Sequence, residues 1–267
     1  MTPDFVATLD WSGPIDSVGH GDAMRGKNRH LTRMVPLIAA LLAIGSTGTI
    51  PGLGQSKLSA EARRVLDRMD ARAKTLTTLT ADLKQTKVTI VVDDRSEKSG
   101  NFYYKKSRRK STFKVDYQEP VRSTILLEKG KVRILEPRIK RYQEIDTGNG
   151  SATTKVPLFW IGQSGRTIRR DNDVRFIKED RVDGRPTSLL ELNPRSTAVK
   201  NLFARIQLWV DHTHWIPIQT RLIEASEDHL TLLLSNVKIN PRLPDRIFDL
   251  RVPADFEKVE QKLPPSP

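Results

Sequence analysis

The stretch that decides the fold is residues 206–256, which read IQLWVDHTHWIPIQTRLIEASEDHLTLLLSNVKINPRLPDRIFDLRVPADF. Apolar and polar side chains alternate with a period of two in three successive runs, at 206–210, 216–222 and 230–234. This period is typical of strands with one buried face. The breaks at 211–214 and 224–228 have the length of hairpin connections. The stretch therefore predicts an antiparallel meander with one apolar face.

The same alternation extends back towards the N-terminus and predicts about ten short antiparallel strands in all. Turn-forming pairs such as Lys129-Gly130 and Asp183-Gly184 separate them. The first strand of the meander is predicted over Asn201–Asp211. Before it, the pattern predicts strands near Leu79–Val92, Gly100–Lys106, Phe113–Tyr117, Ile125–Leu127, Val132–Ile134, Lys140–Ile145, Asp173–Glu179 and Thr187–Leu192.

Two segments depart from the strand pattern. Residues 56–77 place apolar side chains at spacings of three and four, which predicts an amphipathic helix with Ser59 as N-cap and Glu61 in the first turn. Residues 155–163 (KVPLFWIGQ) predict a short apolar helix that begins near Pro157 and stops at Gly162. The apolar cluster Leu158, Phe159, Trp160 and Ile161 is either ordinary core or a movable lid over an apolar cavity.

The N-terminal part has the composition of a secretory leader. A basic segment from Arg25 to Arg33 precedes an apolar run, Met34–Ile44, that is shorter than the roughly 20 residues of a membrane span. A buried N-terminal helix is the alternative. We expect residues 1–55 to be an N-terminal extension and signal peptide cleaved between Ser46 and Gln55, residues 56–262 to be the folded domain, and residues 263–267 to be a disordered tail.

Composition limits the chemistry. The chain has no cysteine, which excludes a thiol nucleophile and lipid attachment at a cysteine. No G-x-S-x-G or S-x-x-K motif is present. His212 and His214 form a His-x-His pair, but they fall in a predicted turn, so we interpret them as exposed turn residues and not as metal ligands. We therefore expect no catalytic residue, no metal site and no cofactor.

The net charge of +13 is compatible with nucleic acid, anionic lipid head groups or acidic proteins as partners. The basic run Lys105–Lys110 lies next to aromatic residues, as in some sheets that bind single strands. Export argues against nucleic acid, so the run is either a solvated loop or a docking surface. The docking alternative concerns Lys105, Lys106, Arg108 and Arg109.

Three further motifs accompany the meander in a specific order. They are LTTLTADLKQT at Leu76–Thr86, GNFYYKK at Gly100–Lys106 and PVRSTILLEKGK at Pro120–Lys131. With them, residues 58–259 resemble the periplasmic outer-membrane lipoprotein-carrier (LolA-like) family. The resemblance implies an α+β fold, an unclosed antiparallel β half-barrel of about ten to eleven strands with a long N-terminal helix and a short inserted lid helix.

The resemblance also implies a function without catalysis. Carriers of this family take acylated lipoproteins across the periplasm from an inner-membrane lipoprotein-releasing transporter to an outer-membrane receptor or membrane, and hold the acyl chains in an apolar cavity. Burial stabilises an acyl chain by roughly 0.8 kcal/mol per CH₂ group. The residues expected to bind the lipid are Phe102, Tyr104, Phe113, Val115, Tyr117, Ile125, Leu127, Leu158, Phe159, Trp160, Ile161, Leu208, Val210 and Ile218.

One departure from the family pattern concerns control of the lid. The family usually has a K-R-P-like step whose Arg helps to hold the lid closed, and here Lys106-Ser107 falls at that step. Lys106 is the positional match, and Arg108 or Arg109 could substitute. We expect a monomeric, periplasmic carrier that is not lipid-anchored. The alternative is a related half-barrel module that binds another lipid or senses lipoproteins in envelope-stress regulation.

Overall fold

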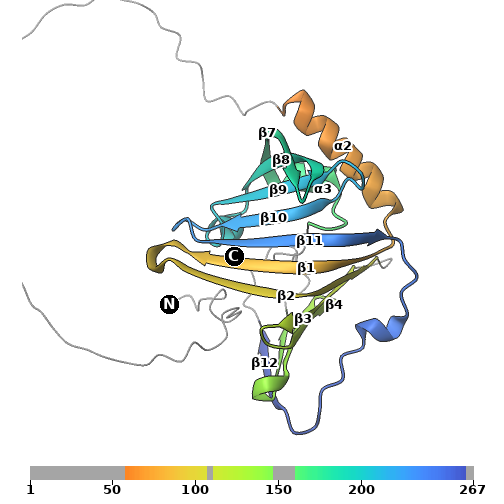
Figure 1. Ribbon diagram of the computed structural model, residues 1–267, viewed down its shortest axis with the longest axis vertical. Helices are drawn as coiled ribbons and strands as arrows, with labels where there is room; N and C mark the ends of the chain where they lie inside the picture. Colours follow the sequence, from red (N-terminus) through yellow and green to blue (C-terminus); the bar gives the residue numbers. More distant parts are fainter. Residues whose placement is uncertain (1–57, 107–110, 147–159, 263–267) are drawn as a thin grey trace, which may run out of the picture. The chain divides into compact units, whose positions relative to one another are not determined.

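The computed structural model of the protein describes residues 58–106, 111–146 and 160–262. Their strands form one twelve-stranded sheet in the order β12-β6-β5-β4-β3-β2-β1-β11-β10-β9-β8-β7 (Figure 1). The strands are β1 (Thr78–Thr89), β2 (Asp94–Lys105), β3 (Thr112–Glu119), β4 (Ser123–Glu128), β5 (Lys131–Glu136), β6 (Arg141–Asp146), β7 (Asn172–Val182), β8 (Arg185–Pro194), β9 (Arg205–Asp211), β10 (Pro217–Ile223), β11 (His229–Ile239) and β12 (Glu257–Lys262). The helices are α2 (Ala60–Thr75), α3 (Gly165–Asp171) and α4 (Thr197–Lys200), with 3₁₀ turns η1 (Ile90–Val92), η2 (Pro137–Ile139) and η4 (Asp245–Phe248).

The predicted fold class is confirmed, with two differences in detail. No pairing among the described strands joins the edges β7 and β12, so the sheet is unclosed. It has twelve strands instead of ten or eleven, and β12 pairs with β6 in parallel, whereas every other pair is antiparallel. The segment between β11 and β12 lies against the outer face of the sheet. There the Lys114 ammonium of β3 donates to the carbonyl of Ile247 at 2.7 Å.

Two of the predicted tight hairpins are confirmed by their backbone conformation. Lys129 and Gly130 have φ of 52° and 83°, and Asp183 and Gly184 have φ of 48° and 75°. Two consecutive residues with positive φ match the right-handed twist of the flanking strands, which is why such turns favour glycine. The hairpins fix the registers of β4 with β5 and of β7 with β8.

The prediction that the first strand continues to Val92 was wrong for its last three residues. The inward-facing positions of β1 are Leu79, Ala81, Leu83 and Gln85, and β1 ends at Thr89. Ile90–Val92 form η1 at the tip of the β1–β2 hairpin, where their side chains are exposed. The apolar triplet therefore does not continue the buried face of β1.

Helix α2 forms as predicted, over a slightly shorter range. The Ser59 hydroxyl accepts from the amide of Ala62 at 3.2 Å, Glu61 lies in the first turn, and the apolar side of the helix is buried. Helix α3 was not predicted, and it lies against α2 so closely that a Cβ on Gly165 would be 2.2 Å from the carbonyl oxygen of Leu66. Figure 1 shows both helices beside the β7–β10 part of the sheet.

Several predictions concern residues outside the described ranges. They are the leader and extension at 1–55, the tail at 263–267, most of the predicted helix at 155–163, and the side chains of Leu158, Phe159, Arg108 and Arg109. The domain boundaries therefore stay predictions. Among the described residues, no helix is both long enough and apolar enough to span a membrane.

Candidate functional site: the inner face of the sheet

The strand registers place one apolar face across the whole sheet, which we call the inner face. Tyr104 lies opposite Leu79 and Phe113, and Phe102 lies opposite Ala81 and Val115. On the other side of β1 the same face continues through β11 to β7. The predicted lipid-binding residues of the strands are all buried and belong to this face: Phe102, Tyr104, Phe113, Val115, Tyr117, Ile125, Leu127, Leu208, Val210 and Ile218.

The helices cover only one part of the inner face. A single apolar cluster joins α2, α3 and α4 to strands β7–β10, and Leu66, Ile168, Leu190 and Leu208 are fully buried within it. The most extensive contacts of the described helices with the sheet are with β7 and β8. The apolar side chains that β2–β5 present on the inner face are buried too, and none of them belongs to this cluster.

The described end of the predicted lid lies on the inner face. Trp160 packs against the helix-covered cluster, and Ile161 is 6% exposed. Gly162 has φ of +75°, and a Cβ there would be 2.5 Å from the Tyr104 hydroxyl oxygen and 2.7 Å from Cζ of the same ring. Residues 160–162 thus link the helix-covered part of the face to the aromatic side chain of β2.

Aromatic side chains cluster beneath this contact. The rings of Tyr104 and Phe113 are 5.2 Å apart between centroids, and those of Phe102 and Phe113 are 6.4 Å apart. The Tyr104 hydroxyl is 3.2 Å from the hydroxyl of Ser111. Burial raises the pKa of Tyr104, and the hydrogen bond with Ser111 lowers it in part, so the phenol stays neutral at physiological pH.

One buried polar pair interrupts the apolar face, and sequence reasoning missed it. The Tyr117 hydroxyl donates to Oε1 of Gln85 at 2.6 Å, and these residues are 2% and 3% exposed. Burial raises the pKa of Tyr117, so it donates as a neutral phenol. The signal in the sequence is the odd-numbered phase of β1, which puts Gln85 on the same side as Leu83.

The two described residues of the predicted docking surface are both engaged by their own chain. The Lys105 ammonium pairs with Asp245 of η4. The Lys106 ammonium donates to the carbonyl of Ala73 near the end of α2 at 2.7 Å, and the Lys106 amide donates to the carbonyl of Thr77 at 2.7 Å. Lys106 thus ties the end of β2 to the end of α2.

His212 and His214 were predicted to be exposed turn residues, but both are partly buried. His212 is half-buried, stacks on Trp215 at 5.3 Å between ring centroids, and places Nε2 2.9 Å from the Ser188 hydroxyl and 3.1 Å from a carboxylate oxygen of Glu179. The Ser188 hydroxyl also donates to that Glu179 oxygen at 2.9 Å. The same nitrogen of His212, Nε2, lies next to both Ser188 and Glu179, so the three groups form a closed triangle. In the serine–histidine–acid relay of a hydrolase, the serine and the acid contact different nitrogens of the histidine. No group of three or more metal-ligating side chains occurs in the described ranges.

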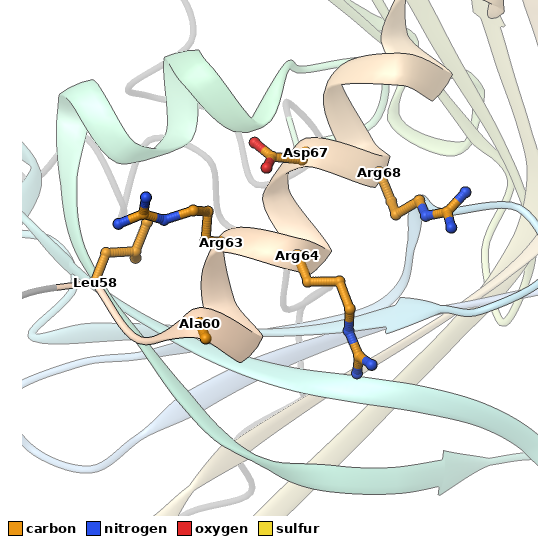
Figure 2. Close-up of a pocket in the computed structure, with 6 residues that line it drawn as sticks. All are labelled: Leu58, Ala60, Arg63, Arg64, Asp67 and Arg68. Atoms are coloured by element: carbon orange, nitrogen blue, oxygen red, sulfur yellow. The ribbon is translucent and has the colours of Figure 1, made fainter.

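Two clefts lie on the helices, outside the inner face. One, of about 680 Å³, follows the outer side of α2 (Figure 2), where Arg64 pairs with Glu179 at 3.1 Å. The other, of about 570 Å³, lies between α2 and the segment after Gly162. Most of the residues that line them carry a charged or polar group, whereas an acyl chain needs an apolar wall. Their linings are Leu58, Ala60, Arg63, Arg64, Asp67 and Arg68 for the first, and Asp67, Asp70, Ala73, Lys74, Lys106, Gly162, Gln163, Ser164, Arg166, Thr167 and Arg169 for the second.

With this geometry established, comparison with known families is decisive. The family model described as "Outer membrane lipoprotein carrier protein LolA" matches residues 74–251. The chain belongs to the LolA family. The matched range runs from the end of α2 through η4 and includes the inner face from β1 to β11. The description of this family is that of a lipoprotein carrier.

Solved structures show low sequence identity to this LolA-family chain. A crystal structure of MucB is 14% identical, with a TM-score of 0.49, over 75% of this chain and 66% of that one. An uncharacterised conserved protein from Thermus thermophilus is 14% identical, with a TM-score of 0.48, over 75% and 99%. LprF from Mycobacterium bovis is 12% identical, with a TM-score of 0.42, over 75% and 99%. No curated protein sequence matches significantly.

Proposed function

We propose that this LolA-family protein is a periplasmic carrier that binds the acyl chains of lipoproteins on its inner face and transfers them from an inner-membrane transporter to the outer membrane. The observation that carries the proposal is the continuous apolar face whose β2–β5 part lies outside the cluster that α2, α3 and α4 form with the sheet. Acyl chains are apolar ligands that suit such a face, and each buried CH₂ group contributes roughly 0.8 kcal/mol.

The test compares a diacylated lipopeptide with the same peptide lacking its acyl chains. We expect the purified full chain to bind only the acylated form. Val115→Glu places an unpaired carboxylate on a fully buried inner-face position and is expected to abolish this binding. Gln118→Glu, on the exposed side of the same strand, is the matched control and keeps wild-type binding. Equal binding of both peptides by the wild type contradicts the proposal.

The bound cargo separates the carrier from its alternative. We expect mass spectrometry of protein purified from the periplasm to find acylated lipoprotein or triacylated peptide. Free glycolipid in place of acylated peptide supports the related module that binds another lipid. Transfer of a bound lipopeptide to acceptor vesicles distinguishes a carrier from a sensor, because a sensor retains its ligand.

In this proposal the basic surface of Lys105, Lys106, Arg108 and Arg109 docks an acidic partner or an anionic head group. Replacing all four of these residues by Ser is expected to weaken binding to vesicles that contain phosphatidylglycerol. Added salt is expected to weaken the binding of the wild type to the same vesicles, since exposed charges are screened over about 8–10 Å. Replacing four exposed basic residues at the far edge of the sheet, Arg175, Lys178, Arg181 and Arg195, is the charge-matched control. Salt-independent binding contradicts this role.

The proposed localisation needs export and removal of the leader. The basic and apolar segments before Ile44 motivate it. We expect the N-terminus of the exported protein to lie between Ser46 and Gln55, and the protein to be a free monomer. Peptide mapping that still finds Met34 in the exported protein contradicts this proposal.

A further inference from the structure

The two clefts on α2 have a strongly basic lining. Three basic residues line the first cleft and four line the second, against two acidic residues, Asp67 and Asp70. This ratio of seven to two exceeds the ratio of 45 basic to 32 acidic residues in the whole chain, so the excess of positive charge is local. The basic residues are Arg63, Arg64, Arg68, Lys74, Lys106, Arg166 and Arg169.

The spacing of residues along α2 joins the two clefts into one groove. Arg63, Asp67, Asp70 and Lys74 follow one another at intervals of four, three and four residues, which places them on one side of the helix. Asp67 lines both clefts, so they meet in the middle of this row. We call the joined clefts the α2 groove. From Arg63 to Lys74 it follows about 17 Å of helix, which is the length of about five residues of extended chain.

The two carboxylates of the α2 groove are engaged by α3. Asp70 accepts a hydrogen bond from the backbone amide of Arg166 at 3.0 Å, and Asp67 lies 3.9 Å from the guanidinium of Arg169. The acidic residues of the groove therefore serve contacts between the two helices.

Three cations of the α2 groove are left for a ligand. The guanidinium of Arg64 pairs with Glu179 at 3.1 Å. The side chains of Arg63, Lys74 and Arg166, in contrast, are exposed and form no ion pair with any described residue. A guanidinium donates two parallel hydrogen bonds to a carboxylate or a phosphate, so these side chains fit an anionic ligand.

The shape of the groove favours an acidic protein segment over a bilayer. A bilayer presents its phosphates as a flat layer, whereas these residues line clefts of about 680 and 570 Å³. Leu58 and Ala60 add apolar surface to the first cleft, and Arg63 extends towards Leu58 (Figure 2). Such a lining suits a segment in which apolar side chains stand between carboxylates.

We infer that the α2 groove is a docking site for an acidic segment of a partner protein, whose carboxylates pair with Arg63, Lys74 and Arg166. This inference goes beyond the proposed function, because the groove lies outside the inner face and does not depend on acyl binding. Lys106 lines the groove and also belongs to the basic surface proposed above, so the test leaves it unchanged.

The test measures by fluorescence anisotropy how the purified full chain binds a dye-labelled peptide of alternating Glu and Leu. We expect the same peptide with Gln in place of Glu to bind more weakly. The groove variant, Arg63→Gln/Lys74→Gln/Arg166→Gln, is expected to bind the Glu peptide about ten-fold more weakly than the wild type, roughly two-fold for each exposed ion pair that is lost.

The matched control is Arg138→Gln/Lys200→Gln/Arg251→Gln. These three residues are also exposed and form no ion pair with any described residue, so the control changes the net charge equally and is expected to keep wild-type affinity. Urea unfolding of both variants is expected to match the wild type, because Gln keeps a good helix propensity and the replaced side chains make no hydrogen bond to described residues.

Three results would overturn the inference. The wild type could bind the Glu and Gln peptides equally, which removes the role of carboxylates. The groove variant and the control could lose the same affinity, which leaves net charge alone as the cause. The groove variant could keep its affinity for the Glu peptide and lose binding to vesicles that contain phosphatidylglycerol, which assigns the groove to a membrane surface. Binding of diacylated lipopeptide is expected to stay unchanged in the groove variant.

Discussion

The contact between Gly162 and Tyr104 predicts a specific cost for one added methyl group. Gly162 has φ of +75°, and so does Gly184 in the β7–β8 turn. Alanine at either position must adopt a left-handed conformation, which costs roughly 1–2 kcal/mol. A Cβ at Gly184 has nothing within 4 Å, whereas a Cβ at Gly162 would be 2.5 Å from the Tyr104 hydroxyl. The two glycines therefore form a matched pair that separates backbone strain from the clash.

The extra cost at Gly162 follows from the burial of its neighbour. Tyr104 is 2% exposed and packs against Phe113, so its ring cannot move aside freely. Overpacking of this kind typically costs about 1–3 kcal/mol. We expect Gly184→Ala to lose about 1–2 kcal/mol of unfolding free energy and Gly162→Ala to lose about 2–5 kcal/mol, by the sum of these two effects. Each kcal/mol corresponds to roughly 2–4 °C in Tm for a domain of this size.

The assay is urea unfolding of both variants, with Tyr104→Ala and the double variant Gly162→Ala/Tyr104→Ala completing a double-mutant cycle. We expect the double variant to be more stable than the sum of the single effects, because the clash disappears with the ring. Lipopeptide release should also be faster in Gly162→Ala, since residues 160–162 are lifted from the inner face. If Gly162→Ala costs no more than Gly184→Ala and the cycle shows no coupling, the segment does not lie on Tyr104.

Two further predictions concern charges away from the inner face. Arg185→Leu is expected to cost about 3–5 kcal/mol, because it leaves the fully buried carboxylate of Asp211 without its cation at 2.8 Å, whereas Arg195→Leu removes an exposed ion pair and should cost less than about 1 kcal/mol in the same urea titration. The hydrogen bond from Lys131 is the largest cause that lowers the pKa of Glu144 from 4.5 to about 2, so its contribution is complete above pH 4.5 and is lost as the pH falls towards 2. The unfolding free energy of Glu144→Gln should therefore fall less than that of the wild type between pH 5 and pH 2, and parallel pH profiles of the two proteins contradict this.

Alternation predicted which strands form and which side chains face inward, because one buried face imposes a period of two on every strand. It did not reveal where the face ends. The prediction for β1 moved from the odd-numbered Leu83 to the even-numbered Val88, which exchanges the two faces of the strand. That change of phase hid Gln85 and placed the exposed residues Ile90–Val92 on a strand.

The elements that sequence reasoning missed depend on tertiary contacts for their stability. Helix α3 (GRTIRRD) has one apolar side chain, Ile168, and forms where Gly165 lets its backbone meet α2. Strand β12 (EKVEQK) shows no apolar alternation, and its pairing with β6 supplies the hydrogen bonds that define it. Local patterns carry little information about such elements, since their neighbours supply the favourable terms.

The division of the inner face predicts that fold stability and ligand binding can be perturbed separately. Leu192 lies in the helix-covered cluster, so Leu192→Ala should cost about 2–5 kcal/mol with or without lipopeptide. Phe102 lies on β2, outside that cluster, so Phe102→Leu should reduce the stabilisation that lipopeptide confers, which is about 2.7 kcal/mol at a hundred times Kd for a wild-type site. The measurement is the change in unfolding free energy on adding lipopeptide, with the deacylated peptide as control. The reasoning is refuted if Leu192→Ala loses the stabilisation by lipopeptide and Phe102→Leu keeps it. That result would place the ligand on the β7–β10 part of the inner face, because only side chains that contact the ligand change its affinity for the folded state.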